Sequence, residues 1–354
     1  MNRLIVAVLS LASFSGGWVS QPSGTRASFR GLSVVDAKTV WVSGTRATFL
    51  RTTDGGATWK LDSIAGADSL DLRDIHAFDA NTAVAISAGP AENGAAKIFR
   101  TVDGGGTWTT AYRTAQKGVF FDAVSFWDAT HGIVMSDPVD GKLFLLVTDD
   151  AGATWGRVPP EGLPAMLPNE AAFAASGTCL AVQGTSNAWI ATGGASVARV
   201  FHSTDRGHTW TVSETPVHSG DSSRAGIFSV AFSNSLNGIV VGGNYSQPKT
   251  SSMNVALTSD GGATWRAATG PTPPGYLSAA AYVPGTQART IVAVGLVGTA
   301  ISADGGNRWT MVDTVGYNAV GFVSVEDAGW AVGDRGRLAK WAGRVNLTIP
   351  VRKP

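Results

Sequence analysis

A stretch of eight residues recurs six times along the chain and constrains its fold more than any other feature. The copies, called octets here, are TTDGGATW (52–59), TVDGGGTW (101–108), TDDAGATW (148–155), STDRGHTW (203–210), TSDGGATW (258–265) and SADGGNRW (302–309). Their aspartates follow one another at intervals of 44 to 55 residues and are Asp54, Asp103, Asp150, Asp205, Asp260 and Asp304. Repetition at this period is typical of proteins built from radial or stacked units, including propeller blades.

Every unit presents its segments in the same order. Two apolar segments joined by a polar turn come first, a third runs into the octet, and a fourth follows its Trp. Residues 317–341 repeat the first three segments without an octet, which makes a seventh unit. Its outer strand could come from the segment at Trp18 or from 344–350. We therefore expect an all-β, seven-bladed β-propeller of four-stranded antiparallel blades over 18–345, followed by a tail at 346–354.

The residue types of the octet suit a tight hairpin turn. An Asp side chain accepts nearby backbone N–H groups, Gly adopts positive φ without steric cost, Thr closes the turn and Trp packs into the next layer. Copies three and four carry Ala151 and Arg206 at the first Gly, and copy six carries Arg308 at the Thr. Because a catalytic residue is needed once and these aspartates occur six times, we interpret them as structural.

The octet matches the Asp-box (BNR) pattern of sialidases, other glycoside hydrolases, sortilin-type receptors and the photosystem II stability/assembly factor family. With phrases such as GWAVGDRG and LRTTDGGATW, the chain most resembles the last of these. The resemblance implies Asp-box hairpins in a sialidase-like propeller and a non-enzymatic assembly or binding role. In photosynthetic members the partner is a precursor of a photosystem core subunit, engaged partly through an arginine patch. That partner does not transfer with the fold.

Composition narrows the cellular setting. Arg3 and the apolar residues 4–14 are typical of a secretory signal peptide over 1–17, which predicts a periplasmic or secreted protein. No other segment is long and apolar enough to span a membrane. A net charge of +1 without basic runs argues against nucleic acid as a partner. Cys179 is the only cysteine, so we expect no intramolecular disulfide and a small buried thiol.

Blade geometry predicts where a binding site would lie. The turn between the first two strands should share a face with the octets, and the longer, less regular loops 87–94, 136–142 and 242–254 belong to the opposite face. Alignment of the units places Arg30, Arg73, Asp122 and Phe228 in one column at the start of the innermost strand, with Glu170 and Arg224 near it. Together with loop residues, the candidate binding set is Arg30, Arg73, Asp122, Glu170, Arg224, Asp137, Asp140, Lys142 and Tyr245.

Such a ring of arginines and carboxylates could hold a peptide carboxylate, a sugar acid or a polar loop, or could be a solvated cap of the channel. Asp137 before Pro138 could serve only to set a turn. The first hypothesis is a monomeric factor that binds a protein or peptide. A carbohydrate is the other class of ligand considered, and no cofactor or metal is expected.

The alternative hypothesis is a sialidase-type glycoside hydrolase, which requires three arginines, a tyrosine paired with a glutamate, and an aspartate acid/base. Its N-terminal Phe/Tyr-Arg-Ile-Pro signature is replaced by Phe29-Arg30-Gly31-Leu32, and the best tyrosine–glutamate pair is Tyr317 with Glu326. His202 and His208 flank the fourth octet without the further ligands of a metal site. Motifs for metalloproteases, serine hydrolases, phosphate loops and dinucleotide folds are absent from the sequence.

Overall fold

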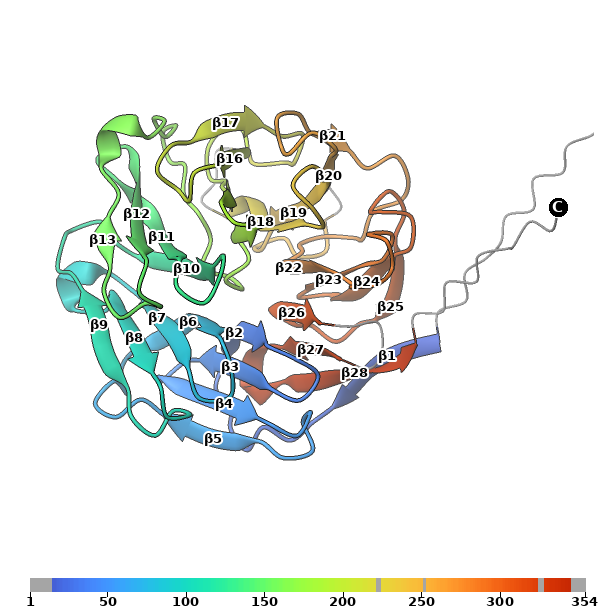
Figure 1. Ribbon diagram of the computed structural model, residues 1–354. Helices are drawn as coiled ribbons and strands as arrows, with labels where there is room; N and C mark the ends of the chain where they lie inside the picture. Colours follow the sequence, from blue (N-terminus) through green and yellow to red (C-terminus); the bar gives the residue numbers. More distant parts are fainter. Residues whose placement is uncertain (1–14, 221–223, 251–252, 324–327, 345–354) are drawn as a thin grey trace, which may run out of the picture.

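The computed structural model describes residues 15–220, 224–250, 253–323 and 328–344. Within these residues the strands form seven sheets of four antiparallel strands each, arranged as blades around a ring (Figure 1). The expected all-β, seven-bladed propeller is confirmed. Three 3₁₀ turns, η1 (Ala91–Asn93), η2 (Pro160–Gly162) and η3 (Asp334–Gly336), are the described helical segments.

The first four blades each take four consecutive strands, from the innermost to the outermost. Their bounds are β2 (Phe29–Val34), β3 (Val40–Gly44), β4 (Thr48–Thr52) and β5 (Lys60–Ser63); β6 (Asp71–Ala77), β7 (Ala83–Ala88), β8 (Lys97–Thr101) and β9 (Thr109–Arg113); β10 (Phe121–Phe126), β11 (Gly132–Val139), β12 (Lys142–Thr148) and β13 (Gly156–Arg157); and β14 (Leu180–Gln183), β15 (Asn187–Ala191), β16 (Arg199–Ser203) and β17 (Thr211–Glu214).

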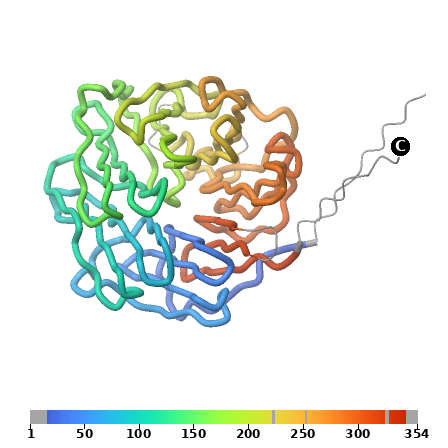
Figure 2. The backbone as a smooth tube through the Cα atoms, in the orientation of Figure 1, coloured from blue at the N-terminus to red at the C-terminus, as the bar shows by residue number. Residues whose placement is uncertain are grey.

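Blades five and six continue this pattern, whereas blade seven combines both ends of the described chain. The bounds are β18 (Ala225–Phe232), β19 (Gly238–Asn244), β20 (Val255–Thr258) and β21 (Arg266–Ala267); β22 (Ala279–Tyr282), β23 (Ile291–Gly295), β24 (Gly298–Ser302) and β25 (Thr310–Asp313); and β26 (Ala319–Phe322), β27 (Gly329–Val332), β28 (Leu338–Arg344) and β1 (Ser15–Ser20). The blades follow one another around the ring in chain order, as the colours of Figure 2 show.

The ring closes through β1, the first strand among the described residues. It pairs antiparallel with β28, with Trp18 opposite Trp341, and thereby supplies the outer strand that blade seven lacks. Trp18 also packs edge-on to Trp341 at 5.0 Å between ring centroids and donates from Nε1 to the Thr299 hydroxyl of blade six (2.9 Å). Of the two closing strands that the sequence allowed, the structure has the one at Trp18; the other, 344–350, falls almost entirely outside the described residues.

The two middle strands of a blade are covered on both faces, which explains their continuous apolar runs. All residues of β7 and β3 are buried, whereas all residues of the outer strand β5 are exposed. The core therefore lies between neighbouring blades. Apolar side chains of facing sheets fill this space, as in a stack of β-sandwiches. Cys179 is a free, buried thiol within this core, as expected.

The octet tryptophans pack against the preceding blade. Trp108 of blade two packs against Phe49 of blade one, with ring centroids 5.4 Å apart. The second octet Gly sits at the same junction: Gly105 has φ of 81°, and a Cβ there would lie 2.6 Å from the Phe49 ring. Glycine is thus required twice at this position, by the backbone conformation and by the close contact.

Candidate functional site

The octets form the turns between the third and fourth strands at one end of the propeller. In the first copy, Asp54 accepts hydrogen bonds from the Thr58 N–H (2.9 Å), the Thr58 hydroxyl (2.6 Å) and the Thr52 hydroxyl (2.8 Å). The Thr58 hydroxyl and N–H lower the pKa of Asp54 to about 2. In copy six Arg308 lacks a hydroxyl, and its N–H still donates to Asp304 (2.9 Å). These bonds carry out the turn-building role that the sequence predicted.

The same turns fix which loops share the octet end. In all six units, the N–H that follows the octet Asp donates to a carbonyl in the turn between strands one and two of its own blade. The first of these bonds joins Gly55 to Lys38 at 2.9 Å, and the third joins Ala151 to Thr130 at 2.9 Å. The loops between strands two and three and the starts of the innermost strands therefore lie at the opposite end, as predicted from blade geometry.

β-bulges interrupt the innermost strands of four blades at that opposite end. In β2, β6, β10 and β18 the pairing with the next strand skips one residue, and the skipped residues are Arg30, Arg73, Asp122 and Phe228. These are the four members of the column aligned from the sequence. A bulge residue is released from the regular alternation of side chains, so it can be directed away from the sheet.

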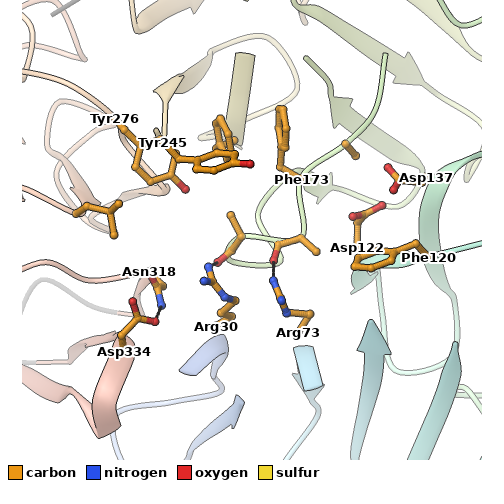
Figure 3. A pocket seen from close by; sticks show the side chains of 15 residues that line it. Arg30, Arg73, Phe120, Asp122, Asp137, Phe173, Tyr245, Tyr276, Asn318 and Asp334 are labelled. Atoms are coloured by element: carbon orange, nitrogen blue, oxygen red, sulfur yellow. Dashed lines mark hydrogen bonds between the residues drawn. The ribbon is translucent and has the colours of Figure 1, made fainter. Parts of the chain in front are cut away.

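All four bulge residues line one pocket of about 450 Å³ (Figure 3). The other lining residues come from blades three, five, six and seven and from the segment between β13 and β14; they are Phe120, Asp137, Ala172, Phe173, Ala174, Ala175, Tyr245, Tyr276, Leu296, Asn318 and Asp334. Arginines, carboxyl groups and aromatic rings thus occupy different sides of a single opening.

The two arginines are held by the segment 158–179, which connects blades three and four. Arg30 Nη1 donates to the Ala175 carbonyl (3.2 Å), and Arg73 Nη1 donates to the Ala174 carbonyl (2.9 Å) (Figure 3). Arg73 also pairs with Asp71, Nε to Oδ2, at 2.7 Å. Burial, with the neighbouring Arg73 charge, lowers the pKa of Arg30. The guanidinium groups are therefore fixed in place and keep part of their donor capacity.

Two of the three carboxyl groups that line the pocket, those of Asp122 and Asp137, are incompletely paired. Asp122 is 1% exposed. Within the described part of the chain, Oδ2 of Asp122 and Oδ1 of Asp137 have no hydrogen-bond partner. Burial, reinforced by the nearby Asp137, raises the pKa of Asp122 well above its usual value, and burial raises the pKa of Asp137 to about 6.

Aromatic rings form the remaining wall. Phe173 stacks on Phe228 with centroids 4.0 Å apart, and Tyr276 meets Phe228 edge-on at 4.7 Å. Tyr276 is buried, which raises the pKa of its hydroxyl to about 12, whereas Tyr245 remains 43% exposed at the rim. A wall of this kind can contact apolar stems and peptide planes.

The structure brings together five of the predicted site residues and leaves four outside the pocket lining. Arg30, Arg73, Asp122, Asp137 and Tyr245 line the pocket. Asp140 lies in the exposed β11–β12 turn, Lys142 donates to the Leu163 carbonyl, and Arg224 is exposed just before β18.

Glu170 is a structural anchor rather than a pocket residue. It is 5% exposed and forms an ion pair with Arg199, whose Nε donates to Oε1 at 2.9 Å. It also accepts from the Thr192 hydroxyl (2.6 Å) and the Leu167 N–H (2.8 Å). These bonds fasten the segment 158–179, which in turn carries the carbonyls that hold the arginines.

Several lining residues were missed from the sequence. In blade seven the aligned column falls on Asn318, directly before β26, so extending the column to that blade would have found it. In blade six, Tyr276 lies two residues before the column and would have been missed. Phe173 belongs to an irregular segment without repeat phrasing and has no such signal. Asp334, also in the lining, accepts hydrogen bonds from Asn318 Nδ2 at 2.9 Å and from the Ser28 hydroxyl.

The tyrosine–glutamate pair and the two histidines of the fourth octet were the remaining candidates for chemistry. Tyr317 is 4% exposed, but Glu326 lies outside the described residues, so their pairing is not described. His202 stacks on Trp189 with centroids 4.7 Å apart, and His208 is exposed. Among the residues that the structure describes, no three His, Cys, Asp or Glu side chains gather as metal ligands, and no helix has the length and apolar character to cross a membrane.

Comparisons by sequence give no match: no protein-family model fits the chain, and no curated protein resembles it. Solved structures do match. The structure described as YCF48 bound to D1 peptide covers 96% of this chain and 99% of its own, with 16% identity and a TM-score of 0.60. YCF48 from Cyanidioschyzon merolae covers 91% of this chain and 98% of its own, with 17% identity and a TM-score of 0.63.

A third match is an enzyme. The GH74 xyloglucanase from Xanthomonas campestris covers 97% of this chain but 55% of its own, with 14% identity and a TM-score of 0.59. The expected resemblance to photosystem II assembly factors is thus confirmed at the level of the fold, because YCF48 is such a factor. At these identities the likeness concerns the fold, so the activity has to be argued from the pocket.

Proposed function

We propose that this protein is a non-enzymatic binding factor that holds a peptide, or an extended segment of a partner protein, in the pocket opposite the octets. Four bulge residues carry this proposal. Arg30, Arg73, Asp122 and Phe228 occupy equivalent places in four blades, yet they differ in charge and polarity and all line one pocket. A purely architectural position would be expected to repeat its residue, as the octets do.

The pocket has the features expected of a site for a polypeptide segment. Arginine donors, carboxyl acceptors and aromatic surfaces border one opening, which suits a ligand with backbone amides and mixed side chains. The description of one similar propeller, YCF48 bound to D1 peptide, supports peptide binding on a fold of this kind.

Site-specific photo-crosslinking tests the proposal. A photo-reactive amino acid replaces Tyr245 at the pocket rim or, as a control, Val102 in the second octet; these side chains are 43% and 56% exposed. After irradiation in the native host, we expect a protein adduct at position 245 that is absent at position 102. Equal adducts at both positions, or none at 245, would contradict binding at the pocket.

The proposal includes a place outside the cytoplasm. The apolar N-terminal segment supports removal of residues 1–17 as a signal peptide, although β1 begins at Ser15. Cleavage after Gly17 would leave Trp18, Val19 and Ser20, which pair with Trp341, Lys340 and Ala339. N-terminal sequencing of the protein from the periplasm or medium should start at Trp18, and light scattering should give the mass of a monomer.

A glycoside hydrolase of sialidase type is the competing function. The fold likeness to a xyloglucanase and the buried carboxyl pair support it. Against it, Glu170, the glutamate that the sequence places near the aligned column, forms an ion pair with Arg199, and the described pocket lining contains two arginines and no glutamate. Turnover of sialosides and aryl glycosides separates the two functions: turnover that Asp122→Asn abolishes would establish the enzyme.

A further inference from the structure

The carboxyl groups of Asp122 and Asp137 share one side of the pocket and are fixed by the backbone of blade three. Asp122 occupies the bulge of β10, and Asp137 directly follows Ser136, which pairs with Phe121. The Asp137 N–H donates to the Phe120 carbonyl (3.0 Å), and the Phe120 N–H donates to the Ser136 hydroxyl (2.9 Å). Figure 3 shows the two carboxyl groups directed toward each other beside the Phe120 ring.

The close approach of these two carboxyl groups is energetically unfavourable in the protein without a ligand. A buried polar atom without a partner costs about 1–3 kcal/mol, and more when it is charged. Arg73 acts electrostatically on Asp122, but its hydrogen bonds go to Asp71 and to the Ala174 carbonyl. One oxygen of each carboxyl stays unpaired among the described residues. Native proteins keep such groups rarely, and mainly where function requires them.

A hydrogen-bond donor that enters from the pocket would supply the missing partner. A divalent metal ion is a poor candidate, because calcium takes six to eight oxygen ligands and no third carboxylate or histidine joins this pair within the described residues. An ammonium or guanidinium group supplies three or more N–H donors and a positive charge. The Phe120 ring lies beside the pair (Figure 3), and an aromatic ring attracts such a cation when it approaches the ring face.

We propose that Asp122 and Asp137 form a subsite for a lysine or arginine side chain of the bound segment, a role that rests on the peptide-binding function proposed above. The cation bridges Oδ2 of Asp122 and Oδ1 of Asp137, and its aliphatic stem passes toward the aromatic wall. The arginine side of the same pocket would repel this side chain. The pair therefore sets the register of the segment as well as contributing to affinity.

The subsite makes binding sensitive to pH. Among the charged and titratable groups nearby, Arg73 on β6 acts on Asp122, and Cys179 before β14 lies within electrostatic reach of both Asp122 and Asp74. Arg30 on β2 in turn interacts with Arg73 and Asp71. Both carboxyl pKa values are raised in the free protein, that of Asp137 to about 6, so a cation must displace protons. Affinity for a basic segment should fall as the pH drops through about 6, because protonated carboxyl groups no longer attract it.

Peptide selection provides the probe. Random peptides displayed on phage are selected on the wild-type protein at a pH of about 8. Each selected peptide is then synthesised in its original form and in forms with one basic residue neutralised. Acetyl-lysine replaces lysine and citrulline replaces arginine; both keep the length of the side chain and remove its charge. On wild type, neutralising the critical residue should weaken binding about tenfold or more. On the Asp122→Asn/Asp137→Asn double variant, the same neutralisation should have little effect.

Asp140→Asn is the matched control, because Asp140 is an exposed acid in the same hairpin outside the pocket lining. It should retain the wild-type preference for the basic residue. Thermal melting of the double variant shows that it folds. Binders that lack basic residues, or equal losses on wild type and double variant, overturn the subsite and leave peptide binding intact.

If no peptide is selected, argininamide is titrated against ¹⁵N-labelled protein. Shifts of the Phe120, Asp122 and Asp137 amides that the double variant abolishes support the subsite. Absence of such shifts overturns it. The proposed function fails separately, through the missing photo-adduct at position 245.

Discussion

The two ends of the propeller place aspartates in opposite environments. At the octet end, Asp54 and Asp103 are exposed and accept several hydrogen bonds each, which lower the pKa of both to about 2. At the pocket end, Asp122 and Asp137 are sheltered from water, each keeps an unpaired oxygen, and their pKa values are raised. The octet aspartates therefore stabilise the fold, whereas the pocket aspartates lower its stability.

The largest effect is expected for ligand binding when the arginine side of the pocket is removed. Arg30→Gln/Arg73→Gln should weaken partner binding by about 2 kcal/mol, roughly 30-fold, because charge-assisted donors are lost. The control is Arg266→Gln/Arg308→Gln, which removes the same charge from exposed positions away from the pocket. Isothermal titration with a selected peptide measures the affinity of both double variants. Equal losses of affinity would contradict a special role of the pocket arginines.

At the octet end the expected effect is on stability. Asp205→Ala should lower the free energy of unfolding by about 1–2 kcal/mol, since it removes the acceptor of the Thr209 N–H (2.8 Å), the Thr209 hydroxyl (2.6 Å) and the Ser203 hydroxyl (2.8 Å). Partial exposure to water keeps the loss within this range. Urea unfolding measures it, with the neighbouring exposed residue changed by Thr204→Ala as the control. Unchanged stability would mean that this octet Asp is dispensable.

In the pocket, replacing an aspartate is expected to stabilise the protein, the opposite of the effect expected for Asp205. Asp122→Asn should raise the free energy of unfolding by about 1 kcal/mol near pH 8, because it replaces a buried, incompletely paired carboxyl group, which ionises more readily in the unfolded chain, with a neutral amide. Since the folded-state pKa of Asp122 is raised, its wild-type penalty is absent below the unfolded pKa of about 4 and develops as the pH rises through the folded pKa. Urea unfolding near pH 4 and near pH 8 checks this, and a destabilised variant near pH 8 would contradict it.

The smallest effect concerns the backbone of the third octet. Ala151 has φ of 62°, so Ala151→Gly should stabilise the protein by about 0.5 kcal/mol, the relief of strain exceeding the added chain entropy. Gly152→Ala is the contrast, because its φ is 77° and a Cβ would lie 2.8 Å from Val84 Cγ2. Thermal melting should shift up for the first and down for the second. A reversed order would refute the assignment of strain.

The fold was predictable because the octet repeats and each octet reports the same turn. The closing strand was not, since two terminal segments had equally strand-like patterns and the choice depends on tertiary packing such as that of Trp18 on Trp341. Within the site, the aligned column found the four bulge residues, because the first turn of each blade fixes the register of the innermost strand.

The failures coincide with departures from the repeat. Glu170 lies in the long connection 158–179, where the unit spacing no longer fixes the register, and Arg224 follows another irregular connection. Phe173 reaches the pocket from the same long connection. Contacts made by such a segment depend on how it crosses the mouth of the ring, which no local pattern records.

The pairing of β1 with β28 has a consequence for how the molecule is made. The earliest strand of the ring cannot find its partner until the last blade has been synthesised, so one contact spans nearly the whole chain and carries a large closure entropy. Blades one to six can pair locally before that moment, and the circle remains open until the end. Docking of the strand that carries Trp18 is then the slow, final event, and a chain truncated before β28 would remain an open arc.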